Sequence, residues 1–522
     1  MRHLSCHLVL AISFTLAGAS SAQIKGPSTG STPYLLPTQS YVSTYSILTT
    51  DNTGAAADDT VGGYGLAGIP DGLGAYDNGD GTFTLLVNHE ISSGSGAVRA
   101  HGTAGAFVSE WVISKSNFAV LSGSDLMRSV YAWNTTTQQS NTTTSTVAFS
   151  RFCSGDLAAP TAFYNSSNGL GSTARIYLHG EEGSANGYQL GTVATGAAKG
   201  KSYILGKFNL STNGSGGSGI GAWENALANP YAQNRTIVIG NNDGGSGIMN
   251  NAIAIYVGTK TNTGSEVDKA GLTNGVTKFI RVTANSAEII NASTRATNIT
   301  SGTAFTLSST ASTSFSRPED GAWNTLDARQ YYFVTTDVYN SLADGQGGQI
   351  GRSRLWRLNF TDIANPDAGG TIDMLLDGTE GQNMFDNIAV SPDGLVFLEE
   401  DVGFSSHNDK VWQYDPVTDT LVQILKHDPA RFGDLSRAAT SPFTADEEAS
   451  GIIDISSIMG VNGVNDKWLI SADQAHYTSG ITSAQVEGGQ IFAIHIVPEP
   501  ATALSLVAGA GLLIGLHRRR RS

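Results

Sequence analysis

The stretch 386-DNIAVSPDGLVFLEED-401 is the clearest copy of the unit from which the chain is built. A short apolar run, 388–390, is followed by the turn Ser-Pro-Asp-Gly and by a second run, 395–398, that ends on acids. Pro, Asp and Gly in this order are typical of a tight turn, so the stretch predicts an antiparallel hairpin. The start of its first strand and the end of its second then lie side by side, which places Asp386 next to Asp401.

Strands that end on a polar, mostly acidic tip recur along the whole chain. Besides Asp401, the tips are at Asn88-His89-Glu90, Gly180-Glu181-Glu182, Asn241-Asn242-Asp243, Thr335-Thr336-Asp337 and Ser471-Ala472-Asp473. They follow one another at about 77 residues on average, and each unit is too small to bury a face alone. Together with 62 glycines and the lack of amphipathic helical periodicity, the repeat predicts an all-β fold, a six-bladed β-propeller with loop insertions.

Acidic residues also stand near the start of the first strand in most units. They are Asp71, Asp156, Glu224, Glu319 and Asp386. In a propeller the innermost strands line a central channel, so acids at equivalent strand ends converge on one mouth. Crowded carboxylates repel one another unless cations neutralise them, which predicts a metal site that includes the tips Glu90, Asp243 and Asp473. The alternative is that Asp and Asn only cap the hairpins.

The order of several short pieces resembles the PhoX-like alkaline phosphatases. The pieces are Gly68-Ile69-Pro70-Asp71-Gly72, Asn88-His89-Glu90, Cys153-Ser154-Gly155, Gly180-Glu181-Glu182, Arg317-Pro318-Glu319-Asp320, Asp386-Asn387 and Glu400-Asp401. They cover most of the chain. The chain departs from the family pattern at Gly180, where the family has a second cysteine.

The resemblance implies a six-bladed propeller whose mouth holds iron and calcium ions. By position, Cys153 matches an iron ligand, and Glu182 and Glu319 match acidic ligands, with Glu181, Asp386 and Asp401 as further ones. A thiolate among carboxylates would select a transition metal, whereas positions with only oxygen ligands suit calcium.

Arg317, two residues before Glu319, matches the family's phosphate-binding arginine, whose planar fork can grip two oxygens. The implied activity is metal-assisted hydrolysis of phosphomonoesters, with Arg317 both binding the substrate and stabilising the transition state. His89 is either a proton carrier for this reaction or a hydrogen-bonded structural residue.

Two other functions remain open on the sequence. The first is a non-catalytic calcium-binding protein of the cell surface or the exopolysaccharide, but neither Arg317 nor Cys153 helps to bind calcium. The second is another propeller hydrolase, of the phytase or lactonase kind.

The two ends of the chain predict export. Residues 1–22 have the basic start, short apolar run and small final residues of a cleaved signal peptide. Residues 497–522 join Val-Pro-Glu-Pro, an apolar stretch and four arginines, and resemble the PEP-CTERM sorting signal. Residues 23–496 then form the propeller. The resemblance implies a sorting enzyme as partner, transient membrane association through the tail, and delivery to the periplasm, surface or matrix of a Gram-negative bacterium.

Charge and cysteine content narrow the partners further. The formal net charge is −15, which disfavours binding to nucleic acid and favours binding of cations. Of the two cysteines, Cys6 lies in the predicted signal peptide, so the exported chain keeps Cys153 as a lone thiol without a disulfide.

Overall fold

The computed structural model describes residues 21–50, 60–182, 187–208, 221–338, 352–403, 405 and 407–497. The predicted signal peptide, apart from its last two residues, and the predicted tail, apart from Val497, lie outside these ranges. The predicted all-β fold is confirmed: the only α-helix described is α1 (Glu266–Lys269), and short 3-10 turns cover Pro160–Ala162, Gly247–Met249 and Pro366–Ala368. None of the described helices is long and apolar enough to cross a membrane.

The strands form large sheets that follow one another along the chain. The first has the order β6 (Pro70–Asp77), β7 (Thr82–His89), β8 (Phe107–Ser114) and β9 (Val120–Asp125). The second has the order β13 (Phe152–Asp156), β16 (Ile176–Glu181), β17 (Gln189–Val193), β18 (Lys201–Ile204) and β10 (Ser129–Tyr131).

A nine-stranded sheet follows, in which β25 joins two groups of four antiparallel strands. Its order is β19 (Leu227–Ala228), β20 (Arg235–Asn241), β21 (Ile253–Thr259), β22 (Val276–Val282), β25 (Thr303–Ser308), β29 (Gly370–Leu376), β28 (Arg354–Phe360), β27 (Gln330–Thr335) and β26 (Pro318–Trp323).

The last two large sheets each take in strands from the N-terminal part of the chain. One has the order β30 (Phe385–Val390), β31 (Val396–Glu400), β32 (Lys410–Asp415), β33 (Thr420–His427) and β2 (Leu35–Pro37). The other has the order β34 (Glu448–Asp454), β35 (Lys467–Gln474), β36 (Gly489–Ile496), β3 (Val42–Thr50) and β1 (Ala22–Lys25). Pairing of β3 with β36 joins the two ends of the described chain.

Four small two-stranded sheets lie in the loops outside the large sheets. They are β4 (Thr60–Val61) with β5 (Tyr64–Gly65), β11 (Trp133–Asn134) with β12 (Gln139–Ser140), β14 (Tyr164–Asn165) with β15 (Leu170–Gly171), and β23 (Ile289–Asn291) with β24 (Ala296–Thr297).

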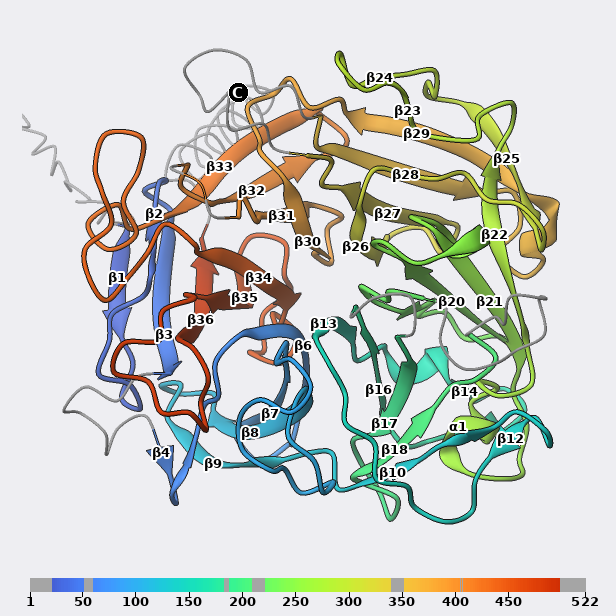
Figure 1. Cartoon of the computed structure of the whole chain (residues 1–522), viewed down its shortest axis with the longest axis horizontal. Helices are drawn as coiled ribbons and strands as arrows, with labels where there is room; N and C mark the ends of the chain where they lie inside the picture. The colour runs from blue at the N-terminus through green and yellow to red at the C-terminus, as the bar shows by residue number, and fades with distance from the viewer. Residues whose placement is uncertain are drawn as a thin grey trace, which may run out of the picture.

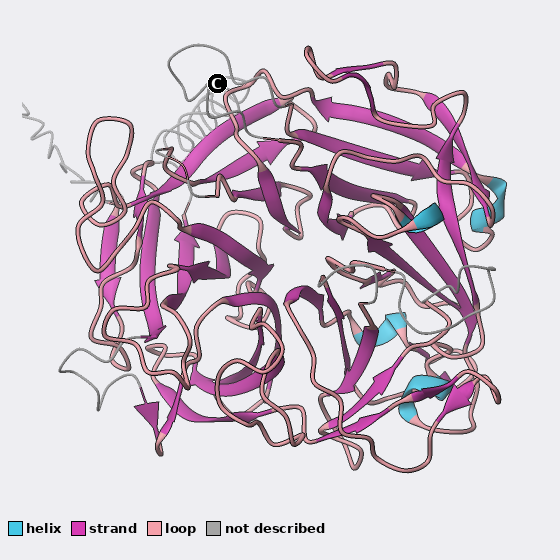
Figure 2. Ribbon diagram, in the orientation of Figure 1, coloured by secondary structure: helices cyan, strands magenta, loops and turns pink. Residues whose placement is uncertain are grey.

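The large sheets stand around a common axis in a propeller-like arrangement (Figures 1 and 2). Their innermost strands touch in a closed ring: β6 contacts β13, β13 contacts β19, β19 contacts β26, β26 contacts β30, β30 contacts β34, and β34 contacts β6. The count of six blades stays a prediction, because two of the expected blades are fused in the nine-stranded sheet.

Apolar cores fill the spaces between neighbouring sheets. One core, for example, joins Phe83 and Trp111 of the first large sheet to Ile470 and Ile491 of the last, all fully buried. Branched and aromatic residues dominate these strands because they pack well on a pleated surface. The apolar cores therefore hold neighbouring sheets against one another.

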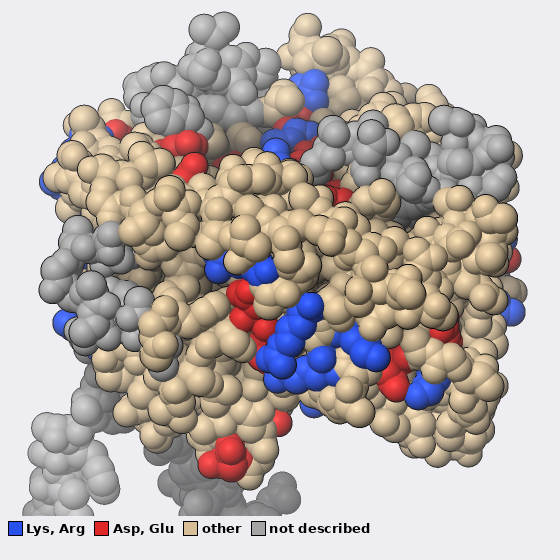
Figure 3. All heavy atoms as spheres, turned by 60° about the horizontal axis from the view of Figure 1, so that its bottom comes forward, with Lys and Arg blue, Asp and Glu red and all other residues tan. Residues whose placement is uncertain are grey.

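Charged side chains on the outer surface stand beside partners of opposite sign. Lys199 and Arg128 both contact Glu110, at 2.6 and 3.1 Å, and Lys115 lies 2.6 Å from Asp77. On the side of the molecule shown in Figure 3, Lys and Arg side chains lie next to Asp and Glu side chains and do not form a separate basic face.

Candidate metal centre

The same irregular hairpin is found at the start of most innermost strands. Its first residue has a positive φ, between 39° and 53° at Ile69, Arg151, Arg317 and Met384. Two residues later the register with the next strand shifts, as it does after Pro70, Phe152, Pro318 and Phe385. Such a bulge redirects a side chain from the sheet face, here towards the channel.

The residues at these four bulges form one set with Glu224, which precedes β19, and Glu448, the first residue of β34; we call this set the inner ring. It has one member at the start of each innermost strand, namely Asp71, Cys153, Glu224, Glu319, Asp386 and Glu448. The set thus contains five carboxylates and one thiol.

The second strand of each hairpin supplies another set, the tip ring. Backbone N–H groups of Glu90, Glu182, Thr336 and Asp401 each donate to the carbonyl oxygen of the residue with positive φ, at 2.9 to 3.0 Å. Register extends the ring to Asp243, beside the Trp223–Asn242 bridge, and to His476, two residues beyond the Glu448–Gln474 pair.

Three groups of side chains in these rings bring their ligand atoms within 4.8 Å of one another. The groups are Asp71 with Glu90 and Cys153, Glu224 with Glu319 and Asp386, and Asp386 with Asp401 and Glu448. Asp386 belongs to two of the groups and so links them. The first group offers sulfur and oxygen, whereas the other two offer oxygen only.

Burial is the largest cause that raises the pKa of the inner-ring acids, and the charges of neighbouring carboxylates add to it. The pKa rises well above its ordinary value for Asp71, Glu319 and Asp386, and to about 7 for Glu448. Burial and the same carboxylates also raise the pKa of the Cys153 thiol. Without cations the centre therefore holds protons, which bound cations would displace.

Several buried oxygens at the centre have no hydrogen-bond partner among the residues that the structure describes. They include Asp71 Oδ1, Asn88 Oδ1 and Asn387 Oδ1. Other polar bonds span the channel: Ser154 Oγ donates to Glu224 Oε1 at 2.8 Å and accepts from Asn387 Nδ2 at 2.7 Å. The unpartnered oxygens and the donor sets fit divalent or trivalent cations.

Two arginines stand at equivalent places in the hairpins, two residues before an inner-ring residue. Arg317 donates from Nε to Asp243 Oδ2 at 3.1 Å and from a terminal nitrogen to Glu319 Oε1 at 2.8 Å. Arg151 donates to Glu90 Oε1 at 2.7 Å and also contacts Glu182. Each arginine keeps part of its side chain exposed, 36% for Arg317 and 47% for Arg151.

Most predicted site residues lie at this centre. Cys153, Glu90, Glu319, Asp386 and Asp401 belong to the three groups. Glu182 lies beside them, since Cys153 Sγ is 3.6 Å from Glu182 Oε2, and Asp243 is bound to Arg317.

Two predicted metal ligands lie elsewhere. Glu181 accepts backbone N–H bonds from Ser150 and Tyr188 at 2.8 and 3.0 Å, because it is on the opposite face of its strand from its neighbour Glu182. Asp473 is bound to the buried His427, away from the three groups. The repeat had been aligned three residues too early in this hairpin, where the tip position belongs to His476.

His89 does not reach the channel. It is fully buried, stacks on Phe107, and has both ring nitrogens in hydrogen bonds, to Gly68 O at 3.1 Å and to Ser109 Oγ at 2.9 Å. Burial lowers its pKa to about 3, so it stays neutral. These contacts favour the structural reading of His89 over that of a proton carrier.

Sequence reasoning missed several residues of the centre. Asp71 and Glu224 had been recognised as strand starts but not as ligands, and Arg151, Glu448 and His476 had not been singled out. Arg151-x-Cys153 repeats the spacing of Arg317-x-Glu319, a signal that was available in the sequence.

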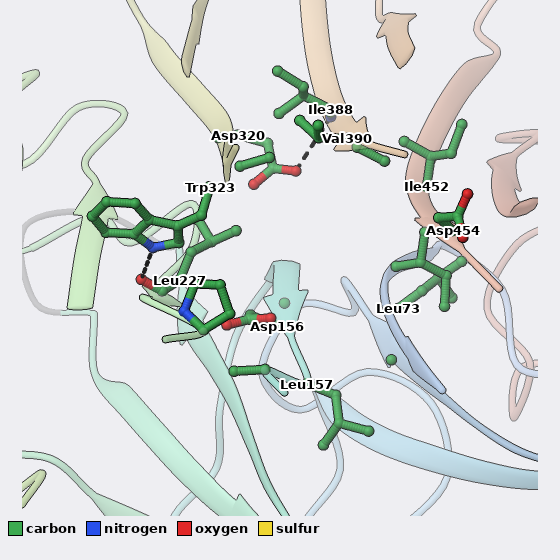
Figure 4. A pocket seen from close by; sticks show the side chains of 18 of the residues that line it. Leu73, Asp156, Leu157, Leu227, Asp320, Trp323, Ile388, Val390, Ile452 and Asp454 are labelled. Atoms are coloured by element: carbon green, nitrogen blue, oxygen red, sulfur yellow. Dashed lines mark hydrogen bonds between the residues drawn. The ribbon is translucent and has the colours of Figure 1, made fainter. Parts of the chain in front are cut away.

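The far ends of the same strands line a cavity of about 270 Å³ with a different character. Figure 4 shows Leu73, Leu157, Trp323, Ile388 and Ile452 around it. The strands rise about 3.3 Å per residue, so this far-end cavity, which Leu73 and Ile388 line two residues beyond Asp71 and Asp386, begins about 7 Å along the strands from the inner ring. Asp156, counted with the strand starts from the sequence, belongs here.

The fold and the centre define an all-β, propeller-like protein with an acidic channel mouth whose side-chain groups could hold cations. No protein-family model matches the chain, and no curated protein matches it. Among solved structures it is similar to PhoX of Pseudomonas fluorescens in complex with vanadate, a transition state analogue, with a TM-score of 0.52 and 12% identity over 92% of this chain and 98% of that one.

Weaker similarities include a fungal alcohol oxidase in complex with copper, with a TM-score of 0.37 and 11% identity over 83% of this chain and 76% of that one. Another is the Trypanosoma rangeli sialidase in complex with sialic acid, with a TM-score of 0.34 and 9% identity over 94% and 62%. At such identities the likeness to PhoX establishes a shared fold.

Proposed function

We propose that the protein is an exported, metal-dependent hydrolase of phosphomonoesters, built as a six-bladed propeller. The nine-stranded sheet counts as two blades in this proposal, one around β19–β22 and one around β26–β29. The observation that carries it is the inner ring, in which every innermost strand of a PhoX-like fold delivers a carboxylate or a thiol to one channel mouth.

The three groups offer different ligand atoms, so we expect them to bind different kinds of ion. The group of Asp71, Glu90 and Cys153 combines a soft thiolate with hard carboxylates, which suits iron. The groups that centre on Asp386 offer only oxygen, which suits calcium. Bound cations would supply electrophilic activation of the phosphoryl group.

Arg317 and Arg151 would bind the remaining phosphoryl oxygens. Each guanidinium is fixed by carboxylates, so it is oriented before the substrate arrives and costs little reorganisation. Nearby carboxylates outweigh burial and raise the pKa of both, so both keep their charge throughout the working pH range. A dianionic phosphomonoester matches two such planar forks.

The test is elemental analysis of the purified chain alongside turnover of p-nitrophenyl phosphate. We expect iron and calcium to be present and turnover to disappear on chelation. Bound calcium without turnover would replace this proposal with the non-catalytic calcium-binding function, and turnover of lactones in place of phosphate esters would favour a lactonase.

The remaining sequence-based expectations belong to the same proposal. Cleavage of residues 1–22, processing of residues 497–522 by a sorting enzyme, and transient membrane contact through that tail would deliver the enzyme to the periplasm, surface or extracellular matrix. Mass spectrometry of the mature chain in its native host would test both cleavages.

A further inference from the structure

A second buried polar cluster lies on the opposite face of the last sheet from the metal centre. Glu448 and Gln474 form a cross-strand pair that faces the mouth, where Gln474 Nε2 donates to Glu448 Oε1 at 3.2 Å and to Glu90 Oε2 at 3.0 Å. Side chains alternate along a strand, so the preceding residues Glu447 and Asp473 point the other way. They face the neighbouring sheet that contains β32 and β33.

That neighbouring sheet contributes a matching pair, Asp409 and His427. The two residues are cross-strand neighbours, with the N–H of His427 donating to the carbonyl oxygen of Asp409 at 3.0 Å. His427 Nε2 is in turn bonded to Asp473 Oδ2, which links the two sheets. All four side chains are buried, with exposed fractions of 0% or 1%.

The charges in this cluster do not balance. Burial opposes protonation of His427, but the carboxylates of Asp473 and Glu447 outweigh burial and raise the pKa of His427, whose one positive charge is paired with Asp473 and also acts on Glu447. Asp409 and Glu447 remain, and among the described residues neither forms an ion pair with a lysine, arginine or histidine. Two buried carboxylates without a counter-charge are costly.

Each of these two carboxylates also has one oxygen without a donor. Asp409 Oδ1 accepts from the N–H of Val402 at 2.9 Å, and Glu447 Oε1 accepts from Asn408 Nδ2 at 3.4 Å. Within the described part of the chain, Asp409 Oδ2 and Glu447 Oε2 are buried without a hydrogen-bond partner. Asn408 Oδ1 is a third unpartnered oxygen, because the amide nitrogen of Asn408 is directed at Gly433 O, 3.0 Å away, and at Glu447.

We propose that Asp409, Glu447 and Asn408 hold one calcium ion between the last two large sheets, separate from the ions at the channel mouth. Three unpartnered oxygens of two acids and one amide are the hard ligands that calcium prefers, and water or backbone oxygens can complete its shell. A single divalent cation balances the two remaining charges. The ion would stabilise the two sheets that β2 and β3 complete from the N-terminal part of the chain.

Glu447→Gln tests the site because it keeps the shape of the side chain and removes its charge. We expect the variant to contain one calcium ion fewer per chain than the unsubstituted protein, and its melting temperature in calcium buffer to fall by several degrees. The sign is decisive at pH 9, because burial raises the pKa of Glu447 to about 8 and the side chain is ionised above it: in the absence of a bound ion, removing a buried and uncompensated charge would there raise the melting temperature.

Asp415→Asn is the matched control, since Asp415 lies at the other end of β32 and accepts hydrogen bonds from Val417 and Thr418 of its own turn. Its calcium count should not change. If Glu447→Gln fails to fold, Asp409→Asn removes the second charge and is expected to lose the same ion. An unchanged calcium count in either soluble variant, or a raised melting temperature, would overturn the proposal, as would the loss of several ions at once.

Discussion

The innermost strands have two ends that differ in what their acids contact. At the far-end cavity, Asp156, Asp320 and Asp454 accept backbone N–H bonds from Ala228, Ile388 and Ser456, at 2.9, 3.3 and 2.9 Å. At the mouth, Asp71, Glu319, Asp386 and Glu448 accept no backbone N–H in the described part of the chain, while Glu224 and Asp401 each accept one, from Ser154 and Gly403. Backbone donors occupy oxygens of all three far-end acids, whereas four of the mouth acids keep their oxygens free of such donors and so available to a cation.

The largest effect is expected from Asp386→Asn, because Asp386 is shared by two of the three groups. Removing its charge weakens both groups, so we expect loss of bound calcium and a fall in phosphoester turnover on the order of 1000-fold. Metal content and p-nitrophenyl phosphate hydrolysis are measured on the same preparation.

Asp454→Asn is the matched control from the far end. It should keep the metal content and at least half the turnover, since its carboxylate lies among Ser456 donors. Equal metal loss in Asp386→Asn and Asp454→Asn would show that acids at the far end contribute to metal binding as much as acids at the mouth.

Arg317→Ala and Glu319→Gln separate substrate binding from metal binding within one hairpin. Losing the arginine should leave the metal content nearly intact while turnover falls about 100-fold, because a preoriented charge at the transition state is removed. Losing the glutamate charge should deplete the metal itself. Arg151→Ala should resemble Arg317→Ala, and unchanged turnover in both arginine variants would mean that neither contacts the phosphoryl group.

The stability of the metal-free protein should fall as the pH rises. Burial raises the pKa of Glu448 from 4.5 to about 7, and that of Asp156 at the far end from 3.8 to about 7. A group with a raised pKa binds its proton more tightly when folded, so its contribution is complete below its unfolded pKa and is lost as pH rises through 7.

Added calcium should distinguish the contribution of Glu448 to the pH dependence of stability from that of Asp156. With the ion bound, the ionised form of Glu448 is stabilised, so the part of the pH dependence that comes from the mouth disappears, while the part from Asp156 remains. Melting temperatures from pH 4 to pH 9, with a chelator and with calcium, would show it. Identical pH profiles in both buffers would contradict cation binding at the mouth.

The repeat of strand, turn and acidic tip was enough to predict the all-β, propeller-like fold, because hairpin periodicity and turn residues are local signals. Glu319 and Asp386 could be placed at strand starts for the same reason, whereas Cys153 was predicted as a ligand only from the resemblance to the PhoX-like phosphatases. The sequence could not show which of two adjacent acids reaches the centre. A bulge shifts the register by one residue, and this shift decides that Glu182 and not Glu181 lies beside Cys153. In the last hairpin, counting acids selected Asp473, although the tip position holds His476.

Leu73→Ala should have the smallest effect on turnover, although it lies only two residues from Asp71. Leu73 is 1% exposed, packs in the core between the first and last large sheets, and lines the far-end cavity. Truncation should lower the free energy of unfolding by about 3 kcal/mol, since the removed methyl groups leave a space that rigid sheets cannot close. Metal content and turnover per folded chain should stay unchanged, as measured by denaturant unfolding, elemental analysis and hydrolysis assays. Loss of metal in this variant would mean that a change in core packing at Leu73 displaces Asp71. The irregular register at Asp71–Gly72 would then not be enough to keep the position of the inner ring independent of the core.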